Sequence, residues 1–169
     1  MEMPSMNKTN NSDVILETRG IIKDFPGQRA LDNVDFDVRK GEVHALIGEN
    51  GAGKSTLIKI IAGLYRADQG EVLIDGAIQN ITNTHESQEL GLSFIHQELN
   101  VVPHLSVAEN IFLGVYPRNK LGIVRISKMV EKAKEIPDAL SIGVDLRTPV
   151  SMLSVIQQWK TVINRALAL

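Results

Sequence analysis

The sequence Gly48-Glu49-Asn50-Gly51-Ala52-Gly53-Lys54-Ser55-Thr56 dictates the architecture of the residues around it. It matches G-x-x-x-x-G-K-[ST], the loop that wraps the phosphates of a nucleoside triphosphate. The apolar run 43–47 precedes the loop and indicates a short buried strand. Residues 55–62 follow it and indicate a helix, with Leu57, Ile58, Ile60 and Ile61 as its apolar positions. The sequence therefore predicts a strand, a phosphate loop and a helix in succession.

The residue types in this loop suit a polyanion. Gly48, Gly51 and Gly53 permit backbone angles that a Cβ would block, and they let amide N–H groups approach phosphate oxygens. The helix that follows offers unpaired N–H groups and the positive end of its dipole. Lys54 would reach the β and γ phosphates, Ser55 would offer its hydroxyl to Mg²⁺, and Thr56 would lie behind it. A plain glycine-rich turn would explain the glycines, but it would not explain the Lys-Ser pair.

The composition excludes several classes of protein. The chain has 169 residues, of which 43% are hydrophobic and 22% charged, as in one ordinary globular domain. The net charge of −2 gives no reason to expect nucleic acid as a partner. Because the chain has no cysteine, disulfides, thiol catalysis and Cys-ligated zinc are excluded, and its 4 histidines show no metal-ligand spacing. No apolar run approaches the ~20 residues that span a bilayer.

Periodicity and turn signals predict further elements. Residues 1–12 are polar, and we expect a disordered tail there. Residues 71–78 form a hairpin signal, because Asp75-Gly76 suits a type I′ turn. Two helix starts carry capping signals, Asn83 with Glu86 and Ser106 with Glu109. The other expected elements are strands at 14–25, 30–38 and 92–95, a charged helix at 127–136 that Pro137 should end, and an amphipathic helix at 154–169 with Val155, Trp159, Val162, Ile163, Ala166 and Leu167 on its apolar face.

The order of these segments resembles the nucleotide-binding domain of ATP-binding-cassette (ABC) transporters. The best match runs from Ile21 to Gly63, through the phosphate loop. Leu105 to Gly114 and Arg147 to Val150 are similar to the ATP-binding subunits of bacterial ribose- and galactose-type importers. The resemblance implies an α/β P-loop NTPase fold over residues 13–169, incomplete at its C-terminus. It also implies an antiparallel β subdomain and a helical subdomain at about residues 98–160.

The resemblance also assigns roles to residues outside the loop. Phe25 falls where the family places an aromatic ring that stacks on adenine, although a core Phe at a strand end is the simpler alternative. Gln97 falls at the glutamine that senses Mg²⁺ and the attacking water, although an isolated Gln after a strand is usually a solvated amide. Ser154 and Gln157 lie in the segment that clasps the γ-phosphate of a second nucleotide-binding domain. The same pair forms a capping-box signal, and both roles can hold together.

Three departures from the family pattern limit what the resemblance implies. Val155 and Ile156 stand where glycines usually let amides come close, and their β-branched side chains take up that room. Pro137 interrupts a segment that is continuous helix in the family. The chain stops at Leu169, before the family's strand ending in Asp-Glu-Pro, whose carboxylates hold Mg²⁺ and polarise the attacking water. We therefore expect a chain that binds Mg-ATP but lacks the residues for efficient hydrolysis, so that an enzymatic activity is left open.

The expected function is the energy-coupling component of a sugar importer. Its expected partners are ATP, transmembrane permease subunits and a second nucleotide-binding domain, at the cytoplasmic face of the plasma membrane, with no contact to the sugar and none to nucleic acid. The alternative is a non-catalytic nucleotide-binding or interaction module, the remnant of a truncated transporter ATPase. A GTPase is disfavoured, because Asn119-Lys120-Leu121-Gly122 lacks the aspartate of the guanine motif.

Overall fold

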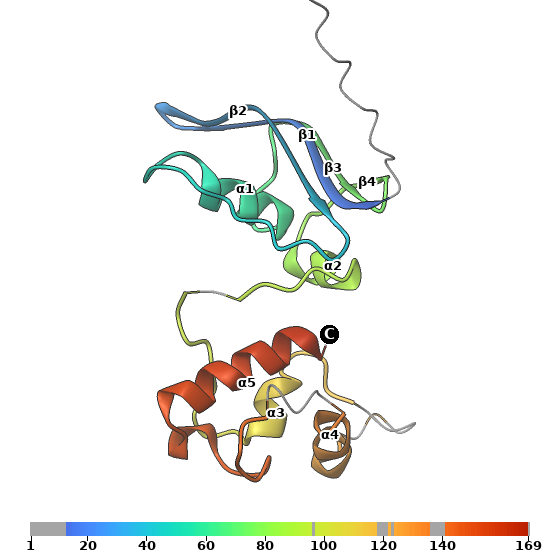
Figure 1. The fold of residues 1–169 in the computed structure, drawn as a ribbon, viewed down its shortest axis with the longest axis vertical. Coiled ribbons are helices and arrows are strands. Elements are labelled where there is room, and N and C mark those ends of the chain that lie inside the picture. Colours follow the sequence, from blue (N-terminus) through green and yellow to red (C-terminus); the bar gives the residue numbers. More distant parts are fainter. Residues whose placement is uncertain (1–12, 96, 118–121, 123, 136–140, 169) are drawn as a thin grey trace, which may run out of the picture. The chain divides into compact units, whose positions relative to one another are not determined.

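The chain divides into two compact units, residues 1–92 and 93–169 (Figure 1). The structure is a computed structural model that describes residues 13–95, 97–117, 122, 124–135 and 141–168. The expected tail, residues 1–12, lies outside the described residues. In the part of the chain that is described, no helix is both long and apolar enough to cross a membrane.

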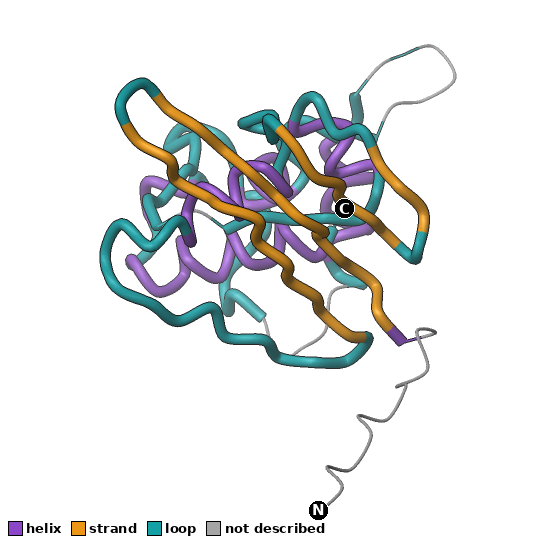
Figure 2. The backbone as a smooth tube through the Cα atoms, turned by 90° about the horizontal axis from the view of Figure 1, so that it is seen from above, coloured by secondary structure: helices purple, strands orange, loops and turns teal. Residues whose placement is uncertain are grey.

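The first unit contains an antiparallel sheet of four strands in the order β2-β1-β3-β4. Strand β1 is Val14–Phe25, β2 is Gln28–Arg39, β3 is Gln69–Ile74 and β4 is Ala77–Gln79. The long β1–β2 hairpin closes at residues 26–27, where Phe25 pairs with Gln28 (Figure 2). The predicted strand 14–25 is confirmed, and the predicted strand 30–38 is two residues longer at its start and one longer at its end.

The β3–β4 hairpin confirms the turn predicted from Asp75-Gly76. Both residues have positive φ, 48° for Asp75 and 77° for Gly76, as a type I′ turn requires. Leu73 pairs with Ile78 across it. This turn forms because an aspartate and a glycine tolerate the left-handed region that most side chains avoid.

Helices α1 and α2 lie in the described part of the first unit (Figure 1). Helix α1, Lys54–Ile61, buries Leu57, Ile60 and Ile61, whereas Ile58 is exposed. Helix α2, Thr84–Glu89, starts at the predicted cap, where the Asn83 side chain accepts a hydrogen bond from the Glu86 N–H at 3.0 Å. The buried Ser87 hydroxyl of α2 donates to the Ile61 carbonyl of α1 at 3.2 Å. That bond ties the two helices to each other.

Two predicted buried strands are absent from the structure. Residues 43–47 form no strand, and the side chains of Val43 and Ile47 are 99% and 88% exposed. Residues 92–95 form no strand either, and Ile95 is exposed. An apolar run becomes a strand only where neighbouring strands take up its hydrogen bonds, and neither run is paired among the described residues. Figure 2 shows the segment between β2 and α1 as a loop.

The second unit is helical. Helix α3 is Val107–Ile111, α4 is Ile126–Ala133 and α5 is Val155–Leu167, with a short 3-10 turn at Val150–Met152. Its core consists of apolar side chains from α3, α4, the 3-10 turn and the residues between these elements: Val107, Ala108, Ile111, Phe112, Met129, Ala133, Ile142, Val150 and Leu153. The capping box predicted from Ser106 and Glu109 is confirmed. The charged helix predicted at 127–136 is present as α4, but it ends at Ala133, before the predicted end, and Pro137 itself lies outside the described residues.

The apolar face predicted for the last helix is wrong at both ends. Val155 and Leu167 are exposed, whereas Thr161 and Asn164 are buried. These polar side chains can be buried because each donates to a backbone carbonyl one turn back. The Thr161 hydroxyl donates to the Gln157 carbonyl at 2.9 Å, and the Asn164 amide donates to the Lys160 carbonyl at 2.7 Å.

Candidate functional site

The phosphate-loop motif forms a tight curl that ends on the first turn of α1. The Ala52 N–H donates to the Glu49 carbonyl at 3.2 Å, which closes a turn inside the loop. The Lys54 ammonium folds back and donates to the carbonyls of Gly48 and Glu49, both at 2.6 Å. The backbone of the motif is thus curled around the nitrogen of the Lys54 ammonium.

Gly53 is the residue that seats the loop against the sheet. Its φ of 84° is left-handed, and it is the N-cap of α1. A Cβ on Gly53 would lie 2.5 Å from the Ala30 carbonyl oxygen and 2.6 Å from a Leu31 methyl carbon, both on β2. Gly51 shares the left-handed conformation, but Gly48 does not. The prediction that all three glycines supply unusual backbone angles is therefore wrong for Gly48, which instead lies close to the Lys54 side chain.

The first N–H groups of α1 form no hydrogen bond with a capping side chain, and the first turn of the helix contains no acidic residue. Ser55 is exposed there and Thr56 is half-buried. An uncapped helix N-terminus presents N–H groups and a partial positive charge, which suits an anion. Together with the Lys54 ammonium, this end of α1 can hold phosphate oxygens, and the Ser55 hydroxyl can reach a cation bound to them.

Phe25 ends β1 in an aromatic cluster that the sequence reasoning missed. Its ring meets the ring of Tyr65 edge to face, with centroids 5.4 Å apart and an interplanar angle of 71°. The Lys23 ammonium lies 5.6 Å from the centroid of the Phe25 ring. Because the Phe25 side chain is 36% exposed, the alternative of a buried core Phe is not what the structure shows. The sequence around Phe25 carries no signal for this contact, because Tyr65 lies forty positions later.

A carboxylate anchors this end of β1. Asp68 accepts hydrogen bonds from the Asp24 N–H at 2.7 Å and from the Lys23 ammonium at 2.9 Å. The Asp68 N–H in turn donates to the Ile22 carbonyl at 2.9 Å. The loop that follows α1 therefore fastens three successive residues of the strand that ends in Phe25.

Acid is expected to loosen this anchor. The Asp24 N–H and, secondly, the Lys23 ammonium hold the pKa of Asp68 below its usual value of 3.8. A carboxylate with a lowered folded pKa stabilises the protein fully above the unfolded value, and that stability is lost as pH falls through the folded pKa. Asp68→Asn should therefore flatten the acid limb of unfolding below about pH 4, measured by urea unfolding at several pH values. Identical acid limbs in the parent and the variant would contradict this assignment.

The remaining predicted site residues belong to the second unit. Gln97 is exposed and lies outside any helix or strand. Ser154 and Gln157 form the predicted capping box: the Gln157 N–H donates to the Ser154 hydroxyl at 3.4 Å, and the Gln157 side-chain oxygen accepts from the Ser154 N–H at 3.0 Å. Val155 and Ile156 are 61% and 71% exposed in the first turn of α5. Their side chains therefore stand in the open beside the amides of that turn.

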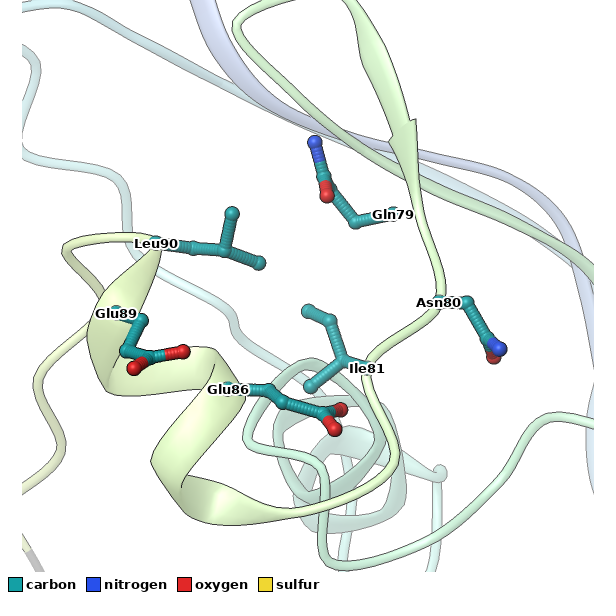
Figure 3. Close-up of a pocket in the computed structure, with 6 residues that line it drawn as sticks. All are labelled: Gln79, Asn80, Ile81, Glu86, Glu89 and Leu90. Atoms are coloured by element: carbon teal, nitrogen blue, oxygen red, sulfur yellow. The ribbon is translucent and has the colours of Figure 1, made fainter.

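A pocket of about 200 Å³ lies elsewhere in the first unit, between β4 and α2 (Figure 3). It is lined by Gln79, Asn80, Ile81, Glu86, Glu89 and Leu90. The two carboxylates give it the wrong sign for a phosphate. Hydrogen bonds from the Thr82 N–H and hydroxyl lower the pKa of Glu86, which keeps that carboxylate charged. Within the described residues, no group of three His, Cys, Asp or Glu side chains could hold a metal ion.

Comparison with known proteins places these features in context. A family model described as ABC transporter matches residues 31–169. The chain is 51% identical over 149 residues to a galactose/methyl galactoside import ATP-binding protein of Clostridium tetani, covering 86% of this chain and 30% of that protein. It is 52% identical over 155 residues to a ribose import ATP-binding protein of Rubrobacter xylanophilus, covering 92% of this chain and 31% of that protein. The chain thus spans about a third of the length of these relatives.

A solved structure gives the same picture of the fold. The ADP conformation of an ATP-binding cassette of an ABC transporter matches with a TM-score of 0.73 and 31% identity. The match covers 92% of this chain and 65% of that one. The predicted α/β fold of the nucleotide-binding type is confirmed by this likeness.

Proposed function

Because this chain belongs to the ABC transporter family, we propose that it binds Mg-ATP at residues 48–56 as part of the energy-coupling subunit of a sugar importer. Two kinds of observation support the proposal. The relatives at 51% and 52% identity are named as import ATP-binding proteins for galactose or ribose. The loop itself is curled around the Lys54 ammonium and leads into an uncapped helix N-terminus, and both features favour an anion such as a triphosphate.

The curl of the loop around the Lys54 ammonium carries the proposal. The ammonium is held by the Gly48 and Glu49 carbonyls at a point where the loop surrounds it. The uncapped N-terminus of α1 begins at the same residue. In the proposed complex Lys54 and the first amides of α1 hold the β and γ phosphates, and the Ser55 hydroxyl holds the Mg²⁺ that neutralises them. Glu49, Asn50, Gly51, Ala52 and Thr56 shape the loop around the phosphates.

Phe25 is proposed as the platform for the adenine base. A partly exposed ring at the end of β1 offers a flat face, and stacking on that face accepts a base without reading its edges. Phe25 pairs with Gln28 at the start of β2, and the Cβ position of Gly53 abuts Ala30 two residues further on. The platform and the phosphate loop are thus joined through the first residues of one strand.

The residues of the second unit are proposed to act after ATP has bound. Gln97 would sense Mg²⁺ and the attacking water, and it would link the nucleotide site to the transmembrane permease subunits. Ser154 and Gln157 would present the N-terminus of α5 to the γ-phosphate held by a second nucleotide-binding domain. The exposed Val155 and Ile156 side chains flank the amides of that turn, so we expect this clasp to be weaker than one built on glycine.

Binding without rapid hydrolysis is the expected behaviour of the chain on its own. Cleavage of the β–γ bond needs a positioned water and usually a carboxylate beside it, and none of the residues proposed here supplies that carboxylate. The chain would work at the cytoplasmic face of the membrane, bound to permease subunits and without touching the sugar. A non-catalytic binding module is the second candidate. Tight ATP binding with no phosphate release, in the presence of permease and a second domain, would favour it.

Replacing Lys54 tests the proposal directly. Lys54→Ala should weaken binding of Mg-ATP at least tenfold, because one charge-assisted contact to phosphate contributes about 1.5–3 kcal/mol. Titration calorimetry at millimolar Mg-ATP measures the change. Lys40→Ala is the control, because it removes an exposed ammonium from the turn after β2 and should leave binding unchanged. No heat of binding from the folded parent protein would overturn the proposed function.

A further inference from the structure

We infer that Tyr65 is a positioning residue that fixes the Phe25 ring as a platform for the nucleotide base. The inference rests on the proposed function and extends it to a residue that has been given no role. Tyr65 does not have to touch the nucleotide. It acts by holding the ring of Phe25 in one orientation.

The aromatic contact is the first support. The rings of Phe25 and Tyr65 meet edge to face at 5.4 Å, inside the range in which such pairs attract. Phe25 ends its strand and is 36% exposed, so part of its surface is open to solvent. A partly exposed ring can leave the stacking orientation by rotation about its side-chain bonds. The Tyr65 ring restricts that rotation.

The backbone around the pair is fixed from the same loop. Asp68 binds the Asp24 N–H and the Lys23 ammonium, and its own N–H binds the Ile22 carbonyl. The loop at residues 65–68 therefore contacts the end of β1 at two points. Asp68 binds the backbone of the strand, and the Tyr65 ring packs against the Phe25 ring.

Tyr65 is also tied to the helix that carries the phosphate loop. The N–H groups of Leu64 and Tyr65 both donate to the Lys59 carbonyl, at 2.8 and 3.1 Å, and the Lys59 ammonium lies 5.3 Å from the centroid of the Tyr65 ring. Helix α1 has 8 residues, so Lys54 and the Tyr65 segment are at opposite ends of a rod about 12 Å long. A rigid rod of this kind sets the spacing between the phosphate-binding ammonium and the base platform.

We therefore expect a change at Tyr65 to weaken binding of the base but not binding of the phosphates. Tyr65→Leu keeps most of the apolar volume but removes the ring, so the affinity for Mg-ATP should fall roughly three- to tenfold. The affinity for Mg-tripolyphosphate, which has no base, should be unchanged. Tyr65→Phe keeps the ring and should restore the affinity for ATP. Titration calorimetry of the full chain with both ligands gives the ratio of the two affinities for each variant.

A second aromatic pair supplies the matched control. His44 meets the ring of Phe36 edge to face at 5.0 Å and 76°, so His44→Ala also removes one partner of an aromatic pair. It should leave the ratio of ATP to tripolyphosphate affinity unchanged. Equal ratios for Tyr65→Leu and the parent would overturn the inference while leaving the proposed function intact. A parallel loss of affinity for both ligands would also overturn it, because Tyr65 would then support the loop itself. A folded parent that binds neither ligand would overturn the proposed function together with the inference.

Discussion

Gly53→Ala is expected to weaken Mg-ATP binding more than a hundredfold and to lower the free energy of unfolding by about 2–5 kcal/mol. Two costs combine at this position. The φ of 84° is left-handed, which costs an alanine about 1–2 kcal/mol. The new methyl carbon would also lie 2.5 Å from the Ala30 carbonyl oxygen, a backbone atom of β2 that cannot rotate away. The loop would have to move off the sheet, and the first turn of α1 and the Lys54 ammonium would move with it.

Gly76→Ala separates the backbone strain from the steric contact. Gly76 has a φ of 77°, and a Cβ there would have no heavy atom within 4 Å. This variant should lose only about 1 kcal/mol of stability and should bind Mg-ATP like the parent. Urea unfolding and titration calorimetry measure both quantities. If the two variants were destabilised equally, the contact between Gly53 and Ala30 would not be what seats the loop.

Asn110→Ala is expected to destabilise the helical unit by about 3 kcal/mol, because the Val102 N–H loses its acceptor and three backbone carbonyls each lose one donor at once. The Asn110 side chain is 0% exposed. Its oxygen accepts from the Val102 N–H at 2.8 Å, and its amide donates to the carbonyls of Val102, Leu105 and Ser106 at 3.0, 3.2 and 3.1 Å. This one side chain therefore ties the non-helical segment that leads into α3 to the helix itself.

The network around Asn110 extends to α5. The Arg165 guanidinium donates to the backbone carbonyls of Asn110 and Asn100, at 2.7 and 2.8 Å. Asn100→Ala is a matched control, because Asn100 is exposed and only its backbone carbonyl accepts a hydrogen bond from Arg165. It should change stability by less than about 0.5 kcal/mol. Urea unfolding, monitored by the fluorescence of Trp159, compares the two variants. Equal unfolding midpoints would show that the hydrogen bonds of the Asn110 side chain do not stabilise the unit.

Caps and turns could be predicted because they depend on neighbouring residues. The capping boxes at Ser106 and Ser154 and the Asn83 cap each join residues three positions apart. The Asp75-Gly76 turn depends on which residues tolerate positive φ. The phosphate loop is local in the same sense, since its glycines, its lysine and its helix start are contiguous. The resemblance to the ABC transporter family added the order of these parts, and the family membership is now established.

Partners that are distant in sequence could not be predicted. Nothing in the residues around Phe25 indicates that its ring meets Tyr65, forty positions later. The buried face of α5 also differs from the one predicted from its apolar positions. Thr161 and Asn164 are buried because carbonyls of the preceding turn accept hydrogen bonds from both side chains. Roles for Phe25, Gln97, Ser154 and Gln157 therefore came from the resemblance, and the mutants proposed here test the aromatic part of them.

By itself the sequence determined the phosphate loop, the helix caps, the hairpin turn and the family, since all of these follow from the dihedral preferences and hydrogen bonds of residues a few positions apart. The tertiary structure alone decided that the apolar runs 43–47 and 92–95 are not strands. It also decided that Gly53 lies against Ala30 and that Phe25 lies against Tyr65. A strand or a ring contact needs a partner from elsewhere in the chain, and hydrophobicity alone does not specify that partner.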